Sequence, residues 1–221
     1  MLFLHFLHIT LQESLVNYGM IFFKVMVYNI FELLVESAIS TLLETVNRIE
    51  NALETNRRLE KEFEHHVLLA FKGAGKEKGF DCIPSSTHGF PDIICKHKES
   101  GLKFGVEVKT GKTWQTNGNS IFTQIGEQDL DEIIVLFCKT TKPIEISWKK
   151  YEDAVNSIAI THSPRYVIKM DTENDNTFFK KMNITYKEFK KMQVEEKMQL
   201  IKSYYLLKEK GGRQWWMSKD K

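Results

Sequence analysis

The sequence has few of the residues that mark disulfide-rich, zinc-binding or disordered proteins. It contains three cysteines, Cys82, Cys95 and Cys138, with no C-x-x-C pair, and four prolines among 221 residues. An odd number of isolated cysteines argues against a zinc site or a disulfide framework, and indicates buried thiols in a reducing cytoplasm. The apolar content of 42% is near average, which excludes a disordered chain.

The N-terminal region shows neither the basic residues and small-residue cleavage pattern expected of a secretion signal nor an unbroken apolar run of about 20 residues. The stretch "MLFLHFLHITLQ" has no basic residues before it, and the next apolar stretch is interrupted by Lys24, Asn29 and Glu32. We therefore expect no membrane segment. Apolar residues then recur in alternating steps of four and three, at Val35, Ile39, Leu42, Val46, Ile49 and Leu53. This heptad pattern predicts a helix that packs on the rest of the chain or on a second copy of it.

The chain has little net charge, but its charges are unevenly distributed. The formal net charge is +2, whereas residues 172–221 hold twelve basic and seven acidic side chains. In "FFKKMNITYKEFKKM" lysines alternate with aromatic residues, which predicts contact with nucleic-acid phosphates. The same stretch also fits an amphipathic helix with four apolar residues inward: Tyr186, Phe189, Met192 and Val194. Both interpretations stay open, as do base stacking and core packing for Trp215 and Trp216.

Two apolar runs on either side of "KESG" predict a β-hairpin. If the turn centres between Glu99 and Ser100, directly opposed residues have numbers that add to 199, so Asp92 faces Glu107. Like charges placed opposite each other repel. Lys109 shares a face with Glu107 because side chains alternate along a strand.

Two carboxylates and an ammonium group therefore converge on one face of this hairpin. A hard divalent cation with oxygen ligands from both carboxylates, a backbone carbonyl and water would offset the repulsion. This donor set predicts magnesium, for which manganese would substitute. The alternative is a hairpin whose charges are solvated.

These residues resemble the signature of the PD-(D/E)XK nuclease superfamily, which includes type II restriction endonucleases and archaeal Holliday-junction resolvases. Pro91-Asp92 is followed, after fourteen residues, by Glu107-Val108-Lys109, and the resemblance covers roughly Glu60 to Asp153. The stretches "IFTQIGEQDLDEIIVLF" and "IEISWKKYEDAV" are similar to the elements that follow the hairpin in restriction-type members.

The resemblance implies roles for individual residues. Asp92 and Glu107 would bind magnesium, the Val108 carbonyl would add a ligand, and Lys109 would orient the attacking water and stabilise charge. Many members add a glutamate from the first helix, for which we choose Glu64 in "LEKEFEHHVLLAF", with Glu60 as the second choice. Gln124 in "FTQIGEQ" would contact the active-site lysine or a phosphate. Solvated helix-surface roles remain open for Glu64 and Gln124.

The order of predicted elements indicates an α/β protein with a restriction-endonuclease-like core, in which helices flank a mixed central sheet. We expect helices to about residue 75, a helix near 119–128, a short helix in "SWKKYEDAVNSIA" and a long helix near 184–210. Strands are expected near 80–86, 90–98, 102–110, 132–138, 143–148 and 166–170. We expect an N-terminal helical segment (1–56), a nuclease core (57–171) and a basic C-terminal helical extension (172–221).

The sequence thus predicts a cytoplasmic, magnesium-dependent DNA endonuclease, most like a sequence-specific type II restriction enzyme. Its expected partners are double-stranded DNA and a second copy of the chain, since one active site cuts one strand. The alternatives are a Holliday-junction or repair nuclease of the same fold and a non-catalytic DNA-binding module.

Overall fold

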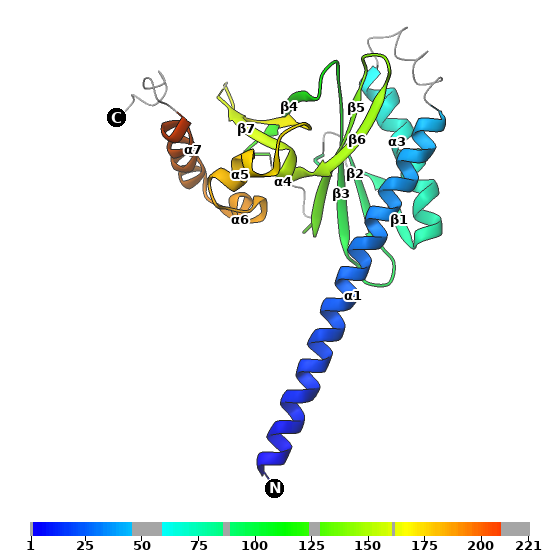
Figure 1. Cartoon of the computed structure of the whole chain (residues 1–221), viewed down its shortest axis with the longest axis vertical. Helices are drawn as coiled ribbons and strands as arrows, with labels where there is room; N and C mark the ends of the chain where they lie inside the picture. The colour runs from blue at the N-terminus through cyan, green and yellow to red at the C-terminus, as the bar shows by residue number, and fades with distance from the viewer. Residues whose placement is uncertain (1, 46–58, 86–88, 124–128, 161, 209–221) are drawn as a thin grey trace. The chain divides into compact units, whose positions relative to one another are not determined.

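The computed structural model describes residues 2–45, 59–85, 89–123, 129–160 and 162–208 (Figure 1). The elements are, in order, α1 (Leu2–Glu44), α3 (Leu59–Lys78), β1 (Phe80–Pro84), β2 (Ile93–His97), β3 (Lys103–Gly111), β4 (Gln115–Ser120), β5 (Glu132–Lys139), β6 (Glu145–Lys150), α4 (Tyr151–Ala154), β7 (Val155–Ala159), β8 (Arg165–Lys169), η1 (Asn174–Asn176), α5 (Phe178–Lys181), α6 (Tyr186–Lys191) and α7 (Val194–Lys208). The chain divides into two compact units. The first comprises residues 1–84, 93–105 and 129–131, and the second comprises residues 85–92, 106–128 and 132–221.

The strands form two sheets. Five strands lie in the order β1-β2-β3-β5-β6, and three form a smaller sheet in the order β4-β8-β7. The pairs β1–β2, β5–β6, β4–β8 and β7–β8 are antiparallel. The predicted α/β class, with a central sheet flanked by helices, is confirmed. All six predicted strands are present within a few residues of their expected bounds.

Aromatic side chains from three elements form the core of the first unit. Phe31 of α1 stacks on Phe104 of β3 with ring centroids 4.2 Å apart, and Phe80 of β1 lies 5.9 Å from each of them. Helices α1 and α3 pack against each other in this unit. Val35, Ile39 and Leu42 of the heptad pattern are buried, as expected of a helix that packs on its own chain. Val46, Ile49 and Leu53 lie outside the described residues.

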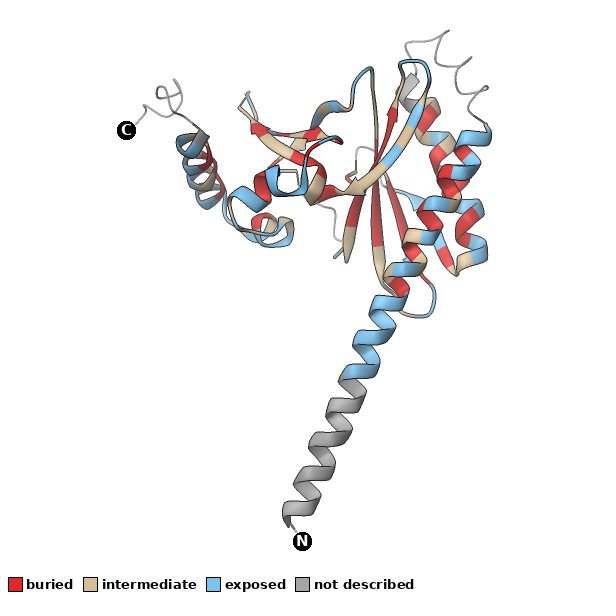
Figure 2. Cartoon of the chain, in the orientation of Figure 1, coloured by how far each residue is buried: buried red, intermediate tan, exposed pale blue. Residues whose placement is uncertain are grey.

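The segment Tyr18–Met26 of α1 is apolar and exposed (Figure 2). The exposed side chains are Tyr18, Met20, Ile21, Phe22, Phe23, Val25 and Met26. Tyr18–Glu44 is long and apolar enough to cross a membrane by length and composition, with only 22% of its most apolar window buried. The expectation of no membrane segment rested on the charges at Lys24 and Glu32. By length and composition, these charges do not exclude a spanning helix. Phe31 and Leu34, farther along α1, are buried in the first unit.

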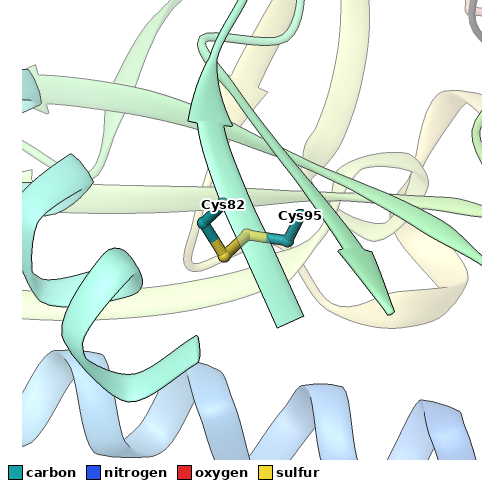
Figure 3. The surroundings of a disulfide bond; sticks show 2 residues. All are labelled: Cys82 and Cys95. Carbon is teal, nitrogen blue, oxygen red and sulfur yellow. A yellow bond between two sulfur atoms is a disulfide. The ribbon is translucent and has the colours of Figure 1, made fainter. Parts of the chain in front are cut away.

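A disulfide bond joins β1 to β2, contrary to the prediction of buried thiols (Figure 3). Cys82 and Cys95 are directly opposed in the antiparallel β1–β2 pair, with Cα atoms 4.1 Å apart. Cys138 on β5 is buried and free. The cysteine count had suggested isolated thiols, but the register of the two strands brings this pair together. This bond removes the argument for a reducing cytoplasm, so cytoplasmic location stays a prediction.

Two helices, α6 and α7, occupy the C-terminal stretch for which one long helix was predicted. The helix predicted near 184–210 is interrupted at Met192, whose backbone is extended, so that α6 and α7 are separate. Helix α6 begins with a capping box, in which the Thr185 side chain accepts from the Glu188 N–H and Glu188 accepts in return. Phe189 is buried as predicted, but Val194 is 52% exposed because it begins the next helix.

The smaller sheet contains two strands, β4 and β7, at positions where no strand was expected. Strand β4 occupies Gln115–Ser120, so a helix does not begin at residue 119 as predicted, and residues 124–128 lie outside the described part. Strand β7, Val155–Ala159, follows directly on the short predicted helix α4. Both strands pair with β8, the central strand of this sheet.

Candidate functional site

The turn between β2 and β3 has the predicted position. The His97 N–H donates to the Leu102 carbonyl at 2.9 Å, and the Gly101 N–H donates to the His97 carbonyl at 3.0 Å. Gly101 has φ +72°, a left-handed conformation that favours glycine. The opposition of His97 and Leu102 is the register in which Asp92 faces Glu107.

Asp92 lies immediately before β2, not within a strand as expected, and backbone hydrogen bonds hold it on two sides. Its Oδ2 atom accepts a hydrogen bond from the Val108 N–H at 2.7 Å. Its own carbonyl accepts from the Ser85 N–H at 2.8 Å. These contacts fix the aspartate against β3, beside the peptide that links Glu107 to Val108.

Glu107 and Lys109 form a close ion pair on β3. The Lys109 Nζ atom lies 2.6 Å from Glu107 Oε1, and the glutamate side chain is 2% exposed. The second carboxylate oxygen, Oε2, is buried and has no hydrogen-bond partner among the described residues. The ion pair therefore satisfies Oε1, and a hydrogen bond between the Glu107 and Asp92 carboxyl groups adds to the contacts of this glutamate.

Burial controls the protonation of both carboxyl groups. It raises the pKa of Glu107 to about 7, although the Lys109 ammonium group opposes the shift and the Asp92 charge adds to it. Burial also raises the pKa of Asp92, against the effects of Lys109 and of the Val108 N–H. The two groups interact, so they titrate as a pair. A bound divalent cation would favour their ionised forms and displace the proton.

The donor set fits a hard cation. Asp92 and Glu107 offer carboxylate oxygens, the ligands that magnesium prefers, and Glu107 Oε2 is a buried oxygen without a partner. In the described ranges, no group of three or more His, Cys, Asp or Glu side chains is placed to hold a metal. The protein ligands at this site would therefore be two carboxylates and a backbone carbonyl, with water completing the shell.

The remaining predicted site residues are placed differently. Val108 lies between Glu107 and Lys109 on β3, and its N–H already binds Asp92, which leaves its carbonyl as the group in question. Glu64 is half-buried on α3 in the first unit, beside the buried Phe63, and its role stays a prediction. The side chain of Glu60 and all of Gln124 lie outside the described residues.

Sequence reasoning did not link two buried tyrosines of the second unit to Glu107. The charge of Glu107 contributes to raising the pKa of both Tyr151 and Tyr186, after the larger effect of burial. Tyr151 belongs to α4 and Tyr186 to α6, and their ring centroids are 5.0 Å apart. No local pattern in the sequence links either tyrosine to residue 107, so only the tertiary structure could identify them.

The basic C-terminal region exposes lysines on two helices of the second unit. Lys180, Lys181, Lys187 and Lys191 are exposed on α5 and α6. Lys190 is partly buried and donates to the Thr123 carbonyl. The exposed lysines fit the predicted phosphate contacts, while the inward Phe189 fits the amphipathic interpretation, so the two are compatible. Trp215 and Trp216 lie outside the described residues.

No protein-family model matches this sequence, and no curated protein matches it. Among solved structures, the chain is similar to Hjc, a Holliday junction resolvase from the archaeal hyperthermophile Archaeoglobus fulgidus. The identity is 15% and the TM-score 0.31, over 50% of this chain and 84% of the resolvase. At this TM-score the similarity does not establish a shared fold or activity. The functional interpretation therefore depends on the chemistry of Asp92, Glu107 and Lys109.

Proposed function

We propose that this protein is a magnesium-dependent endonuclease that hydrolyses phosphodiester bonds in double-stranded DNA, as a sequence-specific type II restriction enzyme does. The observation that supports it most strongly is the cluster of Asp92, Glu107 and Lys109. The buried Glu107 and the half-buried Asp92 interact with each other, and ionising both is costly unless a cation offsets their charge.

Asp92 and Glu107 would hold the magnesium ion, with the Val108 carbonyl as a further ligand and Glu64 as a candidate from α3. When bound, the ion would lower the pKa of a water molecule and stabilise the charge that develops on the phosphate. The hydrogen bond from the Val108 N–H would keep Asp92 Oδ2 in place and so restrict the rotation of the whole carboxylate. Manganese, which also prefers oxygen ligands, would substitute.

Lys109 would orient the attacking water and stabilise negative charge on the phosphate. Its Nζ atom lies 2.6 Å from Glu107 Oε1, which favours the charged ammonium form over a neutral amine. A general base must be neutral before it accepts a proton, so this ion pair argues for orientation and charge stabilisation. Gln124 would assist this lysine or contact a phosphate.

The decisive experiment compares the wild-type protein with Lys109→Ala on unmethylated bacteriophage and plasmid DNA in magnesium. The variant should lose about 100- to 1,000-fold in cleavage rate, the loss typical of removing one charge-stabilising group. Lys103→Ala is the matched control, because Lys103 lies at the other end of the same strand. Discrete wild-type fragments that disappear in Lys109→Ala and persist in Lys103→Ala would support the proposal.

Other substrates distinguish the alternatives. Cleavage of four-way junctions but not of linear duplex would favour a Holliday-junction or repair nuclease. DNA binding without cleavage, with magnesium or manganese, would favour a non-catalytic module. Equal cleavage by wild type and Lys109→Ala would point to a contaminating nuclease and overturn the assignment of this site.

We further propose that the enzyme acts as a homodimer in the cytoplasm. One active site cuts one strand, so two copies related by twofold symmetry suit a symmetric duplex site. Analytical ultracentrifugation with and without cognate DNA measures this directly. A monomer under both conditions would contradict the dimer, and fractionation that finds the protein in the membrane would contradict the location.

A further inference from the structure

The three-stranded sheet of the second unit has one closely packed face and one open face. On β8, Tyr166 and Ile168 are buried, and Gly118 of β4 lies directly against them. A Cβ atom at residue 118 would lie 3.1 Å from the Tyr166 Cβ atom and 3.2 Å from the Ile168 Cγ1 atom. Because side chains alternate along a strand, this close packing fixes which residues of β4 point to the other face.

The strand register assigns the residues of the open face. Gln115 pairs with Lys169, and Asn117 pairs with Val167, which in turn pairs with Ser157 of β7. Arg165 lies two residues before Val167 and therefore points to the same side. A register shift follows Asn117, so the regular alternation of β4 ends there. The open face consists of six side chains, all exposed or half-buried: Gln115, Asn117, Arg165, Val167, Lys169 and Ser157.

The strands of this sheet contribute positive charge to the open face and no carboxylate. Strands β4, β7 and β8 contain Arg165 and Lys169 but no Asp or Glu. Lys169 lies 3.7 Å from Asp171, and the two side chains are 39% and 58% exposed. An exposed ion pair of this kind is weak, so a phosphate group would compete with Asp171 for the lysine. The open face is therefore complementary to a polyanion.

Gln115 and Asn117 are the two side chains of this face that suit the recognition of bases. Both are exposed on β4, an edge strand of the sheet. A side-chain amide presents a donor and an acceptor together, which match N7 and N6 of adenine in the major groove. Residues two apart on a strand lie about 7 Å apart, which is the rise of about two base pairs. The major groove is also wide enough to admit a pair of β-strands.

The path of the chain places the open face close to Glu107 and Lys109. Both residues lie on β3, which ends at Gly111, and β4 begins at Gln115 in the same unit. Gln115 is six positions after Lys109, so their Cα atoms are at most about 22 Å apart. This distance corresponds to about six base pairs. A side chain on β4 is thus near enough to read bases beside the phosphate that Glu107 and Lys109 would approach.

We propose that the open face of the β4-β8-β7 sheet is the surface with which this protein reads the sequence of duplex DNA. Gln115 and Asn117 contact base edges of A·T pairs in the major groove, and Arg165 and Lys169 contact phosphates. This inference rests on the proposed function, because it takes double-stranded DNA as the partner. It adds the residues that determine specificity, which the carboxylate and lysine cluster does not provide.

Selection of bound duplexes from a random-sequence library tests base reading without depending on cleavage. All proteins carry Lys109→Ala, so that bound DNA stays intact, and thermal melts confirm that each is folded. Gln115→Ala and Asn117→Ala are compared with Gln199→Ala, which removes an exposed amide from α7. We expect each of the first two variants to lose about tenfold in preference for adenine at one position. Gln199→Ala should select the same sequences as its parent.

Arg165→Gln tests the phosphate contact separately from base reading. The variant should bind all duplexes more weakly and reduce the slope of log K against log salt concentration by about 0.9, while it selects the same sequences. Lys72→Gln removes an exposed charge from α3 and should leave the slope unaltered. An unchanged slope in Arg165→Gln would overturn the assignment of this residue.

The outcomes separate failure of this inference from failure of the proposed function. Unchanged sequence preference in both Gln115→Ala and Asn117→Ala would overturn the inference, as would a parent protein that binds duplexes without any preference. A change in sedimentation with unchanged preference would assign β4 to a contact between two copies of the chain, and also overturn it. If the preference changes as expected but wild-type protein cuts no DNA, only the proposed function is contradicted. Wild-type protein that binds no duplex would overturn both.

Discussion

The raised pKa of Glu107 has a measurable effect on folding. The folded protein keeps a proton on this group up to about pH 7, whereas the unfolded chain loses it near 4.5. The unfolding free energy of metal-free protein should therefore fall as the pH rises from about 4.5 to 7, by on the order of 3 kcal/mol. Chemical denaturation in a chelator at several pH values measures this slope.

Glu107→Gln provides the control for that slope, because the amide does not titrate. The variant should show a flatter dependence over the same pH range, because the amide resembles the protonated carboxyl group and does not ionise. If wild type and Glu107→Gln had the same slope, another group would be responsible.

At the residue scale, the sequence predicted the three charged residues of the site but not the residues that pack around them. Asp92, Glu107 and Lys109 could be placed together because a hairpin and a period of two are local properties. Tyr151 and Tyr186 lie on helices α4 and α6, which are distant from residue 107 along the chain, so no spacing rule in the sequence links them to it. Hydrogen bonding of Asp92 to the Val108 N–H also required the structure.

The disulfide between β1 and β2 gives a prediction about a single pair of strands. Closing a loop of about 15 residues is worth about 3 kcal/mol in the chain-entropy description, and Cys82 and Cys95 are 13 residues apart. Reductant should therefore lower the melting temperature of the wild-type protein. The double variant Cys82→Ser, Cys95→Ser should melt at a lower temperature that reductant does not change.

Cys138→Ser should retain the sensitivity to reductant, since Cys138 is free. Identical melting of the wild-type protein with and without reductant would show that the bond does not form in solution. A large difference in melting temperature between the oxidised and reduced protein would favour an oxidising cellular compartment, where the disulfide persists.

At the element scale, the predicted strands were those with clear apolar runs. Strand β4 reads "QTNGNS" and has no such run, so its assignment depends on pairing with β8. The break between α6 and α7 falls at Met192 and Gln193, residues that carry no helix-breaking signal. The disulfide was missed because it depends on strand register, which cysteine spacing does not reveal.

The exposed and buried parts of α1 should differ sharply in their effect on stability. Phe22 is 74% exposed and Phe31 is 1% exposed, and both belong to the same helix. Phe22→Ala should change the unfolding free energy by less than about 0.5 kcal/mol, whereas Phe31→Ala should cost about 3–5 kcal/mol. Denaturant titration compares them. A large cost for Phe22→Ala would show that another surface covers this side chain in solution.

At the scale of the whole molecule, the basic helices should determine how DNA binding responds to salt. Each phosphate contact that is lost reduces the slope of log K against log salt concentration by about 0.9. Lys187→Gln with Lys191→Gln should therefore lower the slope, if both lysines contact phosphates. Lys72→Gln with Lys76→Gln on α3 is the control with equal charge change, and it should leave the slope unaltered. An equal change of the salt slope in both double variants would show that net charge, and not phosphate contact by Lys187 and Lys191, determines the slope.

The turn between β2 and β3 limits how this gene can vary. Side chains alternate along a strand, so a one-residue insertion or deletion in residues 98–101 that shifted the register would turn Glu107 and Lys109 to the opposite face. Changes of two residues would preserve the face. Natural variants that keep the site should therefore change the turn by two residues, or by one residue only where a bulge in the turn preserves the strand register.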